Sequence, residues 1–290
     1  MRSFLLGIAL AVSACSTPNS LDKPTSNVSK GAIFSKSLKD SISYHLYFPA
    51  EYHEADTLPM LYLLHGHGGN DSTWVKYGQG NMQQILDSLI SHQLIPPIMA
   101  TTLDAGNTWY VDSHKKMETA FIEDFIPHID SMFQSNMPHS CRIIAGNSAG
   151  GYGALRFTLK YPDFFIAAIL LSPAAYYPAP PPNSSSRKIN VYHRDSLFDV
   201  EVWKSYAHVN LISDYKSKSA NPTLYISTGD DDEYGIVKVA SELKSIMEEH
   251  QIPNELTVIN GIHDWKVWND RFCYDLVRVF RELEASSSIQ

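Results

Sequence analysis

The segment IAGNSAGGYGAL, residues 144–155, decides the fold, because it places a glycine-flanked serine between an apolar run and a helical pattern. Within it, Gly146, Ser148 and Gly150 form the pattern G-x-S-x-G. A sharp turn from a strand into a helix excludes a Cβ two residues before and two residues after its serine. The segment therefore predicts a nucleophile elbow that exposes Ser148. The alternative is a glycine-rich turn whose serine merely faces solvent.

Strand-like apolar runs and helical patterns alternate along the chain on both sides of this turn. Strands are expected at 43–48, 59–64, 98–103, 143–144, 165–171, 223–227 and 256–259, and helices at 82–92, 117–133, 149–160, 236–250 and in a closing segment up to 284. Continuous apolar strands separated by helices form a mostly parallel central sheet with helices on both faces. The expected class is therefore α/β, with the chemistry at the carboxyl ends of the strands.

Length, composition and charge limit the number of domains and the kinds of partner. The chain has 290 residues, 44% of them hydrophobic, which suffices for one large core. We expect a single catalytic-size domain over residues 31–290. The net charge is −8 and no block of Lys and Arg is present, so nucleic acid is not an expected partner.

The first residues have the features of an export signal. Arg2 precedes an apolar stretch, residues 4–12, that is too short to cross a bilayer. The following VSAC, residues 12–15, resembles the lipobox of bacterial lipoproteins, in which the cysteine is lipidated and becomes the N-terminus. We therefore expect a signal peptide at 1–14. The alternative is an ordinary signal peptide whose cysteine is incidental.

The lipobox resemblance implies a lipid anchor on Cys15. Several acyl chains on one residue hold a protein on a membrane more firmly than the single chain that binds only marginally. The polar run at 15–30 is expected to be a tether. The expected location is the bacterial cell envelope after export, and Ser16 resembles the residue found in lipoproteins that are sent on to the outer membrane.

Two cysteines, Cys141 and Cys273, remain after such processing. Two are too few for a disulfide-stapled scaffold or for a zinc site built from cysteines alone. One begins an expected strand and the other lies in the last helix, so we expect two buried free thiols. Export would also permit a bridge between them.

A serine hydroxyl is a poor nucleophile unless a base takes its proton. Among 12 histidines, His263 follows the expected strand 256–259 and precedes the closing helix, where the base of such a fold is found. His193, His208 and His250 also lie downstream of the serine. The first two fall in an irregular insertion and the third ends a helix. His263 is therefore the expected base.

The acid that orients this histidine is expected after the strand 223–227. There the chain reads TGDDDE, residues 228–233, with four consecutive carboxylates. Spacing alone does not choose among them. A solvated turn or a calcium-binding loop is the alternative explanation of the acidic run.

Two backbone N–H groups are needed to hold the negative charge that develops on a substrate oxygen. The residue after the serine, Ala149, supplies one. The loop HGHGG, residues 65–69, follows the expected strand 59–64 and lies where the second donor is found in such folds. Its H-x-H spacing also suits a metal, but no third ligand has a recognisable spacing. Neither a metal nor a cofactor is expected.

Five segments together resemble the motifs of the esterase-D-like α/β-hydrolases, the group that includes feruloyl esterases, S-formylglutathione hydrolases and mycolyltransferases. The segments are LYLLHGHGGNDSTW (61–74), TWYVDS (108–113), IAGNSAGGYGAL (144–155), STGDDDEY (227–234) and GIHDWKVW (261–268). The resemblance spans residues 41–283. It implies an α/β-hydrolase fold.

The resemblance also implies roles for individual residues. It implies that Asp232 is the acid and His263 the base, and that the N–H groups of His67 and Ala149 form the oxyanion hole. In the family, aromatic and apolar residues commonly follow the aspartate, whereas an acidic residue follows here. Asp231 therefore stays an alternative acid.

Substrate selection is expected in an aromatic-rich cap formed by the insertion 174–218. Trp109, Tyr110 and Trp265 are expected near the same mouth as substrate-binding residues. Aromatic residues of the insertion, such as Trp203, suit sugar rings or phenolic acyl groups, and they suit core packing equally well.

These features together predict a lipid-anchored serine carboxylesterase that acts through an acyl-enzyme on carbohydrate-linked or small acyl or phenolic esters. The alternatives are acyl transfer on the same scaffold and a non-catalytic, carbohydrate-binding surface lipoprotein. The expected partners are a small-molecule or glycan ester and, through the N-terminal anchor, a membrane.

Overall fold

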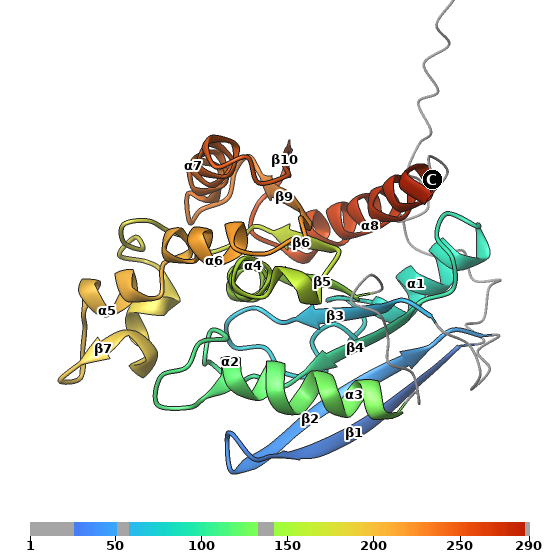
Figure 1. The fold of residues 1–290 in the computed structure, drawn as a ribbon, viewed down its shortest axis with the longest axis horizontal. Coiled ribbons are helices and arrows are strands. Elements are labelled where there is room, and N and C mark those ends of the chain that lie inside the picture. The colour runs from blue at the N-terminus through green and yellow to red at the C-terminus, as the bar shows by residue number, and fades with distance from the viewer. Residues whose placement is uncertain (1–25, 51–57, 133–141, 288–290) are drawn as a thin grey trace, which may run out of the picture.

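The computed structural model describes residues 26–50, 58–132 and 142–287, and its central feature is an eight-stranded sheet (Figure 1). The strands follow the order β1-β2-β4-β3-β5-β6-β9-β10. β1 pairs antiparallel with β2, and β2 pairs antiparallel with β4, whereas every other neighbouring pair is parallel. The predicted α/β class with a mostly parallel sheet is confirmed.

The central strands of this sheet are short, apolar and buried. The strand bounds are β1 Asn27–Ser35, β2 Asp40–Phe48, β3 Met60–Leu64, β4 Met99–Leu103, β5 Arg142–Asn147, β6 Ala167–Leu171, β9 Thr223–Gly229 and β10 Asn254–Ile259. Every residue of β3, β4, β5 and β6 is buried. Burial on both faces explains why these strands read as continuous apolar runs.

Helices cover both faces of the sheet (Figure 1). The helix bounds are α1 Met82–Ser91, α2 Met117–Thr119, α3 Ile126–Met132, α4 Ala149–Lys160, α5 Val200–Ser205, α6 Ile212–Lys216, α7 Ile236–Glu249 and α8 Trp265–Ser287. In β3, Leu61 and Leu63 belong to the apolar cluster that includes residues of α1 and α8, whereas Tyr62 belongs to the cluster that includes residues of α3, α4 and α7. The sheet therefore lies between two apolar layers. No described helix is both long enough and apolar enough to cross a bilayer.

The helix predicted at 117–133 is not a single α-helix. A π-helical segment, Ala120–Phe125, separates α2 from α3. Pro127 follows it, and a proline has no N–H to bond to the carbonyl four residues earlier, which breaks the α-helical ladder. The apolar periodicity across this region gave no sign of the change in helix type.

The first strand, β1, lies where the sequence predicted a tether. It pairs with β2 from Asn27 to Ser35, so residues 27–30 belong to the sheet and the predicted tether boundary at residue 30 is wrong. Only Ile33 and Ser35 of this strand are buried. An edge strand with one neighbour tolerates polar residues along its length, which hides it from apolar patterning. The signal peptide at 1–14 and Cys15 lie outside the described residues.

The insertion 174–218 folds mainly into short elements. It holds 3₁₀ turns at Ser185–Lys188, Asn190–Tyr192 and His208–Leu211, a hairpin of β7 His193–Arg194 and β8 Leu197–Phe198, and the helices α5 and α6. In Figure 1, α5 and β7 extend beyond the sheet at the left of the view, whereas α6 lies beside α4.

Cys273 on α8 is disulfide-bonded and fully buried. The expectation of two free thiols is therefore wrong for Cys273. Cys141 lies outside the described residues. Cys273 belongs to the same apolar cluster as Ile143 of β5, so α8 packs on the face of the sheet that holds the start of this strand.

Candidate active site

Ser148 lies on the turn between β5 and α4, at the carboxyl end of the sheet. Its backbone has φ 54° and ψ −116°, and such a left-handed φ costs a non-glycine residue about 1–3 kcal/mol. A Cβ on Gly146 would lie 2.3 Å from the carbonyl oxygen of Gly150, and one on Gly150 would lie 2.2 Å from that of Leu64. Glycine at these two positions therefore allows the turn that presents the serine hydroxyl.

The side chains of Ser148, His263 and Asp232 form one hydrogen-bonded series. His263 Nε2 lies 2.9 Å from Ser148 Oγ, and His263 Nδ1 lies 2.6 Å from Asp232 Oδ2. The three residues follow β5, β10 and β9, and the carboxyl ends of parallel strands meet at one edge of the sheet. With Nδ1–H donated to the carboxylate, Nε2 is free to accept the serine proton.

Asp232 is the residue of the acidic run that reaches His263. Its side chain is fully buried, and its second oxygen, Oδ1, accepts the N–H of Tyr234 at 3.0 Å. Asp231 is exposed. Asp230 accepts a backbone N–H of the histidine loop at 2.9 Å. The geometry thus shows that Asp232, and not Asp231, contacts His263. The spacing of the sequence alone did not decide between them.

The other downstream histidines lie away from the serine. His193 Nε2 lies 3.0 Å from the carbonyl oxygen of Arg187. His250 caps the carboxyl end of α7. His208 is buried in the insertion, beside Tyr177. Among the described contacts, His263 is the histidine that bonds to Ser148.

The loop after β3 lies against the serine turn. A Cβ on Gly66 would lie 3.4 Å from Ser148 Cβ and 3.0 Å from Asn147 Nδ2. The N–H of His67 has no hydrogen-bond acceptor within the described residues. The N–H of Ala149 lies in the first turn of α4, where amides have no intrahelical acceptor. Both amides are therefore available to a negative charge that develops beside Ser148.

His65 holds this loop in place. Its Nδ1 lies 2.8 Å from the carbonyl oxygen of Gly66, and its Nε2 accepts the N–H of Ala105 at 3.1 Å. Burial lowers the pKa of His65, which keeps the imidazole neutral, as an accepting Nε2 requires. Both nitrogens are thus used by the protein. In the described ranges, no group of three or more His, Cys, Asp or Glu residues is arranged to hold a metal ion.

The side chain of His67 also stays neutral. Burial is the main cause that lowers its pKa, and the charge of Lys188 lowers it further. Trp109 Nε1 donates to His67 Nδ1 at 3.3 Å. The neutral imidazole therefore carries its proton on Nε2 and can donate a hydrogen bond from that atom.

A cleft of about 620 Å³ opens over Ser148 and His263. Its aromatic lining residues are Trp109, Tyr176, Tyr234, Trp265 and Trp268. Two of the three predicted substrate-binding residues, Trp109 and Trp265, therefore lie at the cleft. Polar side chains, among them Asn70, Lys76 and Ser185, also line the cleft, so it offers contacts to both the apolar and the polar parts of a small organic ligand.

Tyr110, the third predicted substrate-binding residue, does not line the cleft. It is 1% exposed, its hydroxyl donates to the carbonyl oxygen of His65 at 2.9 Å, and its ring packs closely on Gly153. Trp109 and Tyr110 both have a left-handed φ, 53° and 59°. The chain therefore turns at this pair, and the two side chains have different surroundings.

Two aromatic residues beside the histidine were not predicted as site residues. The Tyr234 ring lies edge-on to His263 at 4.9 Å, and the Trp268 ring does so at 5.0 Å. Both restrict the orientation of the imidazole. The signal was present in the sequence, because Tyr234 ends STGDDDEY and Trp268 ends GIHDWKVW.

The aromatic residues of the insertion mostly form its core. Trp203 is fully buried, stacks on Tyr152 at 5.7 Å and meets the edge of Tyr192 at 4.6 Å. Its Nε1 donates to the carbonyl oxygen of Tyr176 at 3.2 Å. Core packing is thus the role of Trp203, whereas Tyr176 reaches the cleft.

Comparison with protein families gives one match that covers most of the chain. The model of a family described as "Putative esterase" matches residues 35–279. An acetyl esterase from Caldicellulosiruptor saccharolyticus is 29% identical over 228 residues, which are 74% of this chain and 81% of that protein. An endo-1,4-beta-xylanase/feruloyl esterase from Xylanibacter ruminicola is 29% identical over 163 residues, 52% of this chain and 22% of that longer protein.

Solved structures share the fold. A ferulic acid esterase matches with a TM-score of 0.75 and 23% identity, covering 89% of this chain and 99% of that one. An S-formylglutathione hydrolase from Staphylococcus aureus matches with a TM-score of 0.71 and 16% identity, covering 88% and 99%. The eight-stranded sheet, the serine turn and the family match lead to one conclusion: the chain belongs to the esterase family of α/β-hydrolases and is a carboxylic ester hydrolase.

Proposed function

We propose that the enzyme cleaves esters with Ser148 as the nucleophile, His263 as the base and Asp232 as the supporting acid. The observation that carries this proposal is the continuous hydrogen-bonded series from Ser148 Oγ through the imidazole to the buried carboxylate. A serine becomes nucleophilic when an adjacent base accepts its proton, and the base needs a third group to hold its orientation. Ser148 and His263 line one cleft, and the buried carboxylate of Asp232 contacts the imidazole at Nδ1.

The reaction proceeds through an acyl-enzyme. Ser148 Oγ attacks the ester carbonyl carbon while His263 Nε2 takes the hydroxyl proton, and the carbonyl oxygen becomes an oxyanion held by the N–H groups of His67 and Ala149. His263 then gives the proton to the leaving alcohol. Water, deprotonated by the same nitrogen, attacks the acyl-enzyme and releases the acid. Asp232 supports the imidazolium that forms in each half.

The proposed substrates are short acyl or phenolic esters of carbohydrate hydroxyl groups. Two observations support this class. Aromatic rings, among them Trp109 and Trp265, line the cleft beside Ser148, and such rings suit phenolic acyl groups and the faces of sugars. The relatives named above are an acetyl esterase and a xylanase that is also a feruloyl esterase. The neutral donor on His67 adds a hydrogen bond for a substrate oxygen.

We also propose that the protein is exported and carries a lipid on Cys15. The sequence around that cysteine resembles a lipobox. The disulfide-bonded state of Cys273 supports export, because disulfides persist in oxidising compartments outside the cytoplasm. Labelling of cells with radioactive palmitate tests the anchor. We expect label on the wild type and none on Cys15→Ala, and a wild type without label would contradict the proposal.

The ester-hydrolase proposal is tested with a panel of substrates and a matched pair of serine variants. Acetylated xylo-oligosaccharide, a feruloyl sugar ester, a short-chain aryl ester and an S-acyl thioester are offered to the wild type, Ser148→Ala and Ser185→Ala. Ser185 lines the same cleft but bonds to neither His263 nor Asp232. We expect hydrolysis by the wild type and Ser185→Ala, and loss of it in Ser148→Ala. Retained hydrolysis in Ser148→Ala would contradict the assigned nucleophile.

A further inference from the structure

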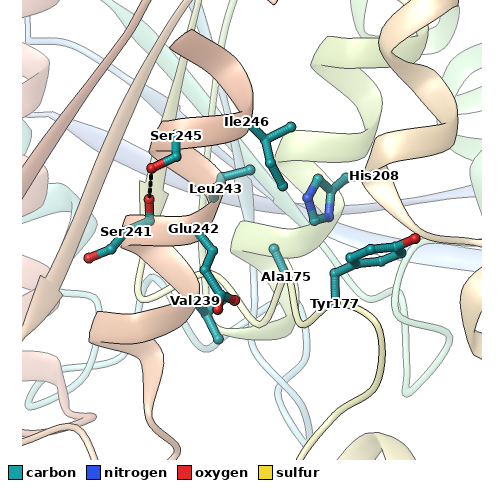
Figure 2. Close-up of a pocket in the computed structure, with 9 residues that line it drawn as sticks. All are labelled: Ala175, Tyr177, His208, Val239, Ser241, Glu242, Leu243, Ser245 and Ile246. Carbon is teal, nitrogen blue, oxygen red and sulfur yellow. Dashed lines mark hydrogen bonds between the residues drawn. The ribbon is translucent and has the colours of Figure 1, made fainter. Parts of the chain in front are cut away.

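A second groove, of about 440 Å³, lies between the insertion and α7 (Figure 2). Figure 2 shows Tyr177 and His208 on one side, side chains of α7 such as Glu242 and Ile246 on the other, and Ala175 between them. Its volume falls in the range of small-ligand sites. Neither Ser148 nor His263 lines it.

His208 is a buried histidine that lines the groove. The residue is 1% exposed, and neither of its ring nitrogens has a hydrogen-bond partner among the described residues. A buried polar group without a partner costs about 1–3 kcal/mol. Burial and the nearby charge of Arg156 lower the pKa of His208 to about 4. The neutral ring therefore offers one donor and one acceptor.

Tyr177 packs against this imidazole. Its ring packs edge-on against His208 at 6.4 Å with an interplanar angle of 73°. Tyr177 is 46% exposed, so it can turn outward without leaving a filled core site. A hydroxyl group that enters when Tyr177 turns would satisfy one of the two nitrogens that the protein leaves unpaired.

The side of the groove formed by α7 carries one acceptor, the carboxylate of Glu242 (Figure 2). The hydroxyls of Ser241 and Ser245 donate to the carbonyl oxygens of Val237 and Ser241 in their own helix. In Figure 2 both hydroxyls point away from Tyr177 and His208. No Lys or Arg is among the described residues that line the groove. This arrangement disfavours anions and favours hydroxyl donors.

Apolar surface completes the groove. Ala175, Val239, Leu243 and Ile246 line it and offer no hydrogen bonds from their side chains. A ring with an apolar face and hydroxyl groups at its edge matches both the apolar lining and the polar groups around it. A pyranose and a phenol share this chemistry.

We propose that the groove formed by Ala175, Tyr177, His208 and the facing side of α7 is a second binding site, which takes one neutral ring that bears hydroxyl groups. The site lies directly behind the catalytic cleft. Ala174 and Tyr176 line the cleft, whereas Ala175 and Tyr177 line the groove. One stretch of backbone therefore separates the two sites. A ring bound there holds a polymeric or aromatic substrate beside the enzyme without occupying the reacting centre.

Histidine-labelled protein gives a direct test. The ring nitrogens of His208 are observed by NMR in protein carrying ¹⁵N-histidine and are assigned with His208→Gln. The protein is titrated with glucose, phenol and sodium acetate in turn. We expect a saturable shift of the His208 signals with glucose, with phenol or with both, and none with acetate. Glucose alone would identify a sugar site, and phenol alone an aromatic one.

Two variants of exposed residues on α7 locate the binding. Glu242→Phe fills the groove, and Glu249→Phe makes the same change on the same helix outside the residues that line it. We expect Glu242→Phe to abolish the saturable shift and Glu249→Phe to retain it, with hydrolysis of a short-chain aryl ester, which is too small to reach the groove, unchanged in both. Absence of saturation by glucose and phenol, as for a site that holds only ordered water, would overturn the proposal. So would binding that survives Glu242→Phe, or an equal response to acetate.

Discussion

Asp232 Oδ2 lies 2.6 Å from His263 Nδ1 while the other oxygen of the same carboxylate accepts the N–H of Tyr234 at 3.0 Å. Both oxygens are therefore committed, and the side chain is fully buried. A carboxylate held in this way fixes the plane and the tautomer of the imidazole. Its neighbour Asp231 is exposed and cannot take over this role without moving the loop.

The two aspartates can be separated by matched substitutions. Asp232→Asn keeps the shape of the side chain but removes the charge that selects the Nδ1–H tautomer, and we expect turnover to fall by about 10⁴-fold, as is typical when a serine triad loses its acid. Asp231→Asn should change turnover less than about threefold, because surface changes have small effects. The measurement is kcat on an activated aryl ester. A larger loss in Asp231→Asn than in Asp232→Asn would reverse the assignment.

The buried imidazole of His208 makes stability depend on pH. Its pKa falls from an ordinary 6.5 to about 4 in the folded protein, so the unfolded chain binds the proton first as the pH drops. Stability from this residue is complete above pH 6.5 and is lost as the pH falls towards 4, by about 3 kcal/mol. His208→Gln should remove this dependence. The measurement is the difference in unfolding free energy between wild type and variant at pH 7 and pH 4.5.

A difference that stays constant between those two pH values would mean that His208 titrates normally. The wild type must be compared with His208→Gln because the titration of Asp275 changes stability over the same pH range in the opposite direction. Desolvation raises the pKa of Asp275 to about 6, although Arg271 opposes the shift. The two residues are on different elements, so their contributions should add.

Asp275 therefore provides an independent prediction. Its folded-state pKa lies above the ordinary value of 3.8, so the folded protein binds this proton more tightly, and its contribution to stability is lost as the pH rises from about 4 through 6. The loss amounts to about 3 kcal/mol. Asp275→Asn cannot titrate at this position. As the pH rises from 4 to 7, the variant should therefore become more stable relative to the wild type by this amount. A flat difference between pH 4 and pH 7 would refute the shifted titration.

Substitutions of two tryptophans, one in the core of the insertion and one at the catalytic cleft, should affect different properties of the enzyme. Trp203 is fully buried in the insertion, so Trp203→Ala should lower the unfolding free energy by about 3–5 kcal/mol through the cavity it leaves. Trp265 is half-buried and lines the cleft. Trp265→Ala should therefore raise KM, and it should lower the unfolding free energy less than Trp203→Ala does. Urea denaturation and steady-state kinetics on both variants provide the comparison. Equal KM for Trp265→Ala and wild type would remove this residue from the substrate site.

The elbow and the sheet were predictable because each rests on a local constraint. The turn at Ser148 requires glycine at two fixed positions, and the five residues 146–150 show this pattern in the sequence. Strands buried on both faces must be apolar throughout, and they read accordingly. The sequence order of strands and helices then places their carboxyl ends together.

Other features of the fold and the site depend on contacts between residues that are distant in sequence, and a local sequence pattern does not predict such contacts. Asp231 and Asp232 have the same chemistry, and which one faces the histidine depends on the path of the loop. Trp109 and Tyr110 are both buried and both have a left-handed backbone. Only Trp109 lines the cleft, whereas the hydroxyl of Tyr110 bonds to the carbonyl oxygen of His65. β1 is polar because it lies at an edge, so apolar patterning did not find it. Cys273 is disulfide-bonded, and no pattern in the sequence of its helix indicates this.

The acyl-enzyme itself provides the most direct test of the account. The wild type is mixed with an activated aryl acetate, quenched in acid within the first turnover and digested, and the peptides are weighed by mass spectrometry. The account predicts one acetyl group on the hydroxyl of Ser148, appearing with the burst of released phenol and absent in Ser148→Ala. An acetyl group on another residue at the same rate, or hydrolysis by Ser148→Ala at the wild-type rate, would contradict it.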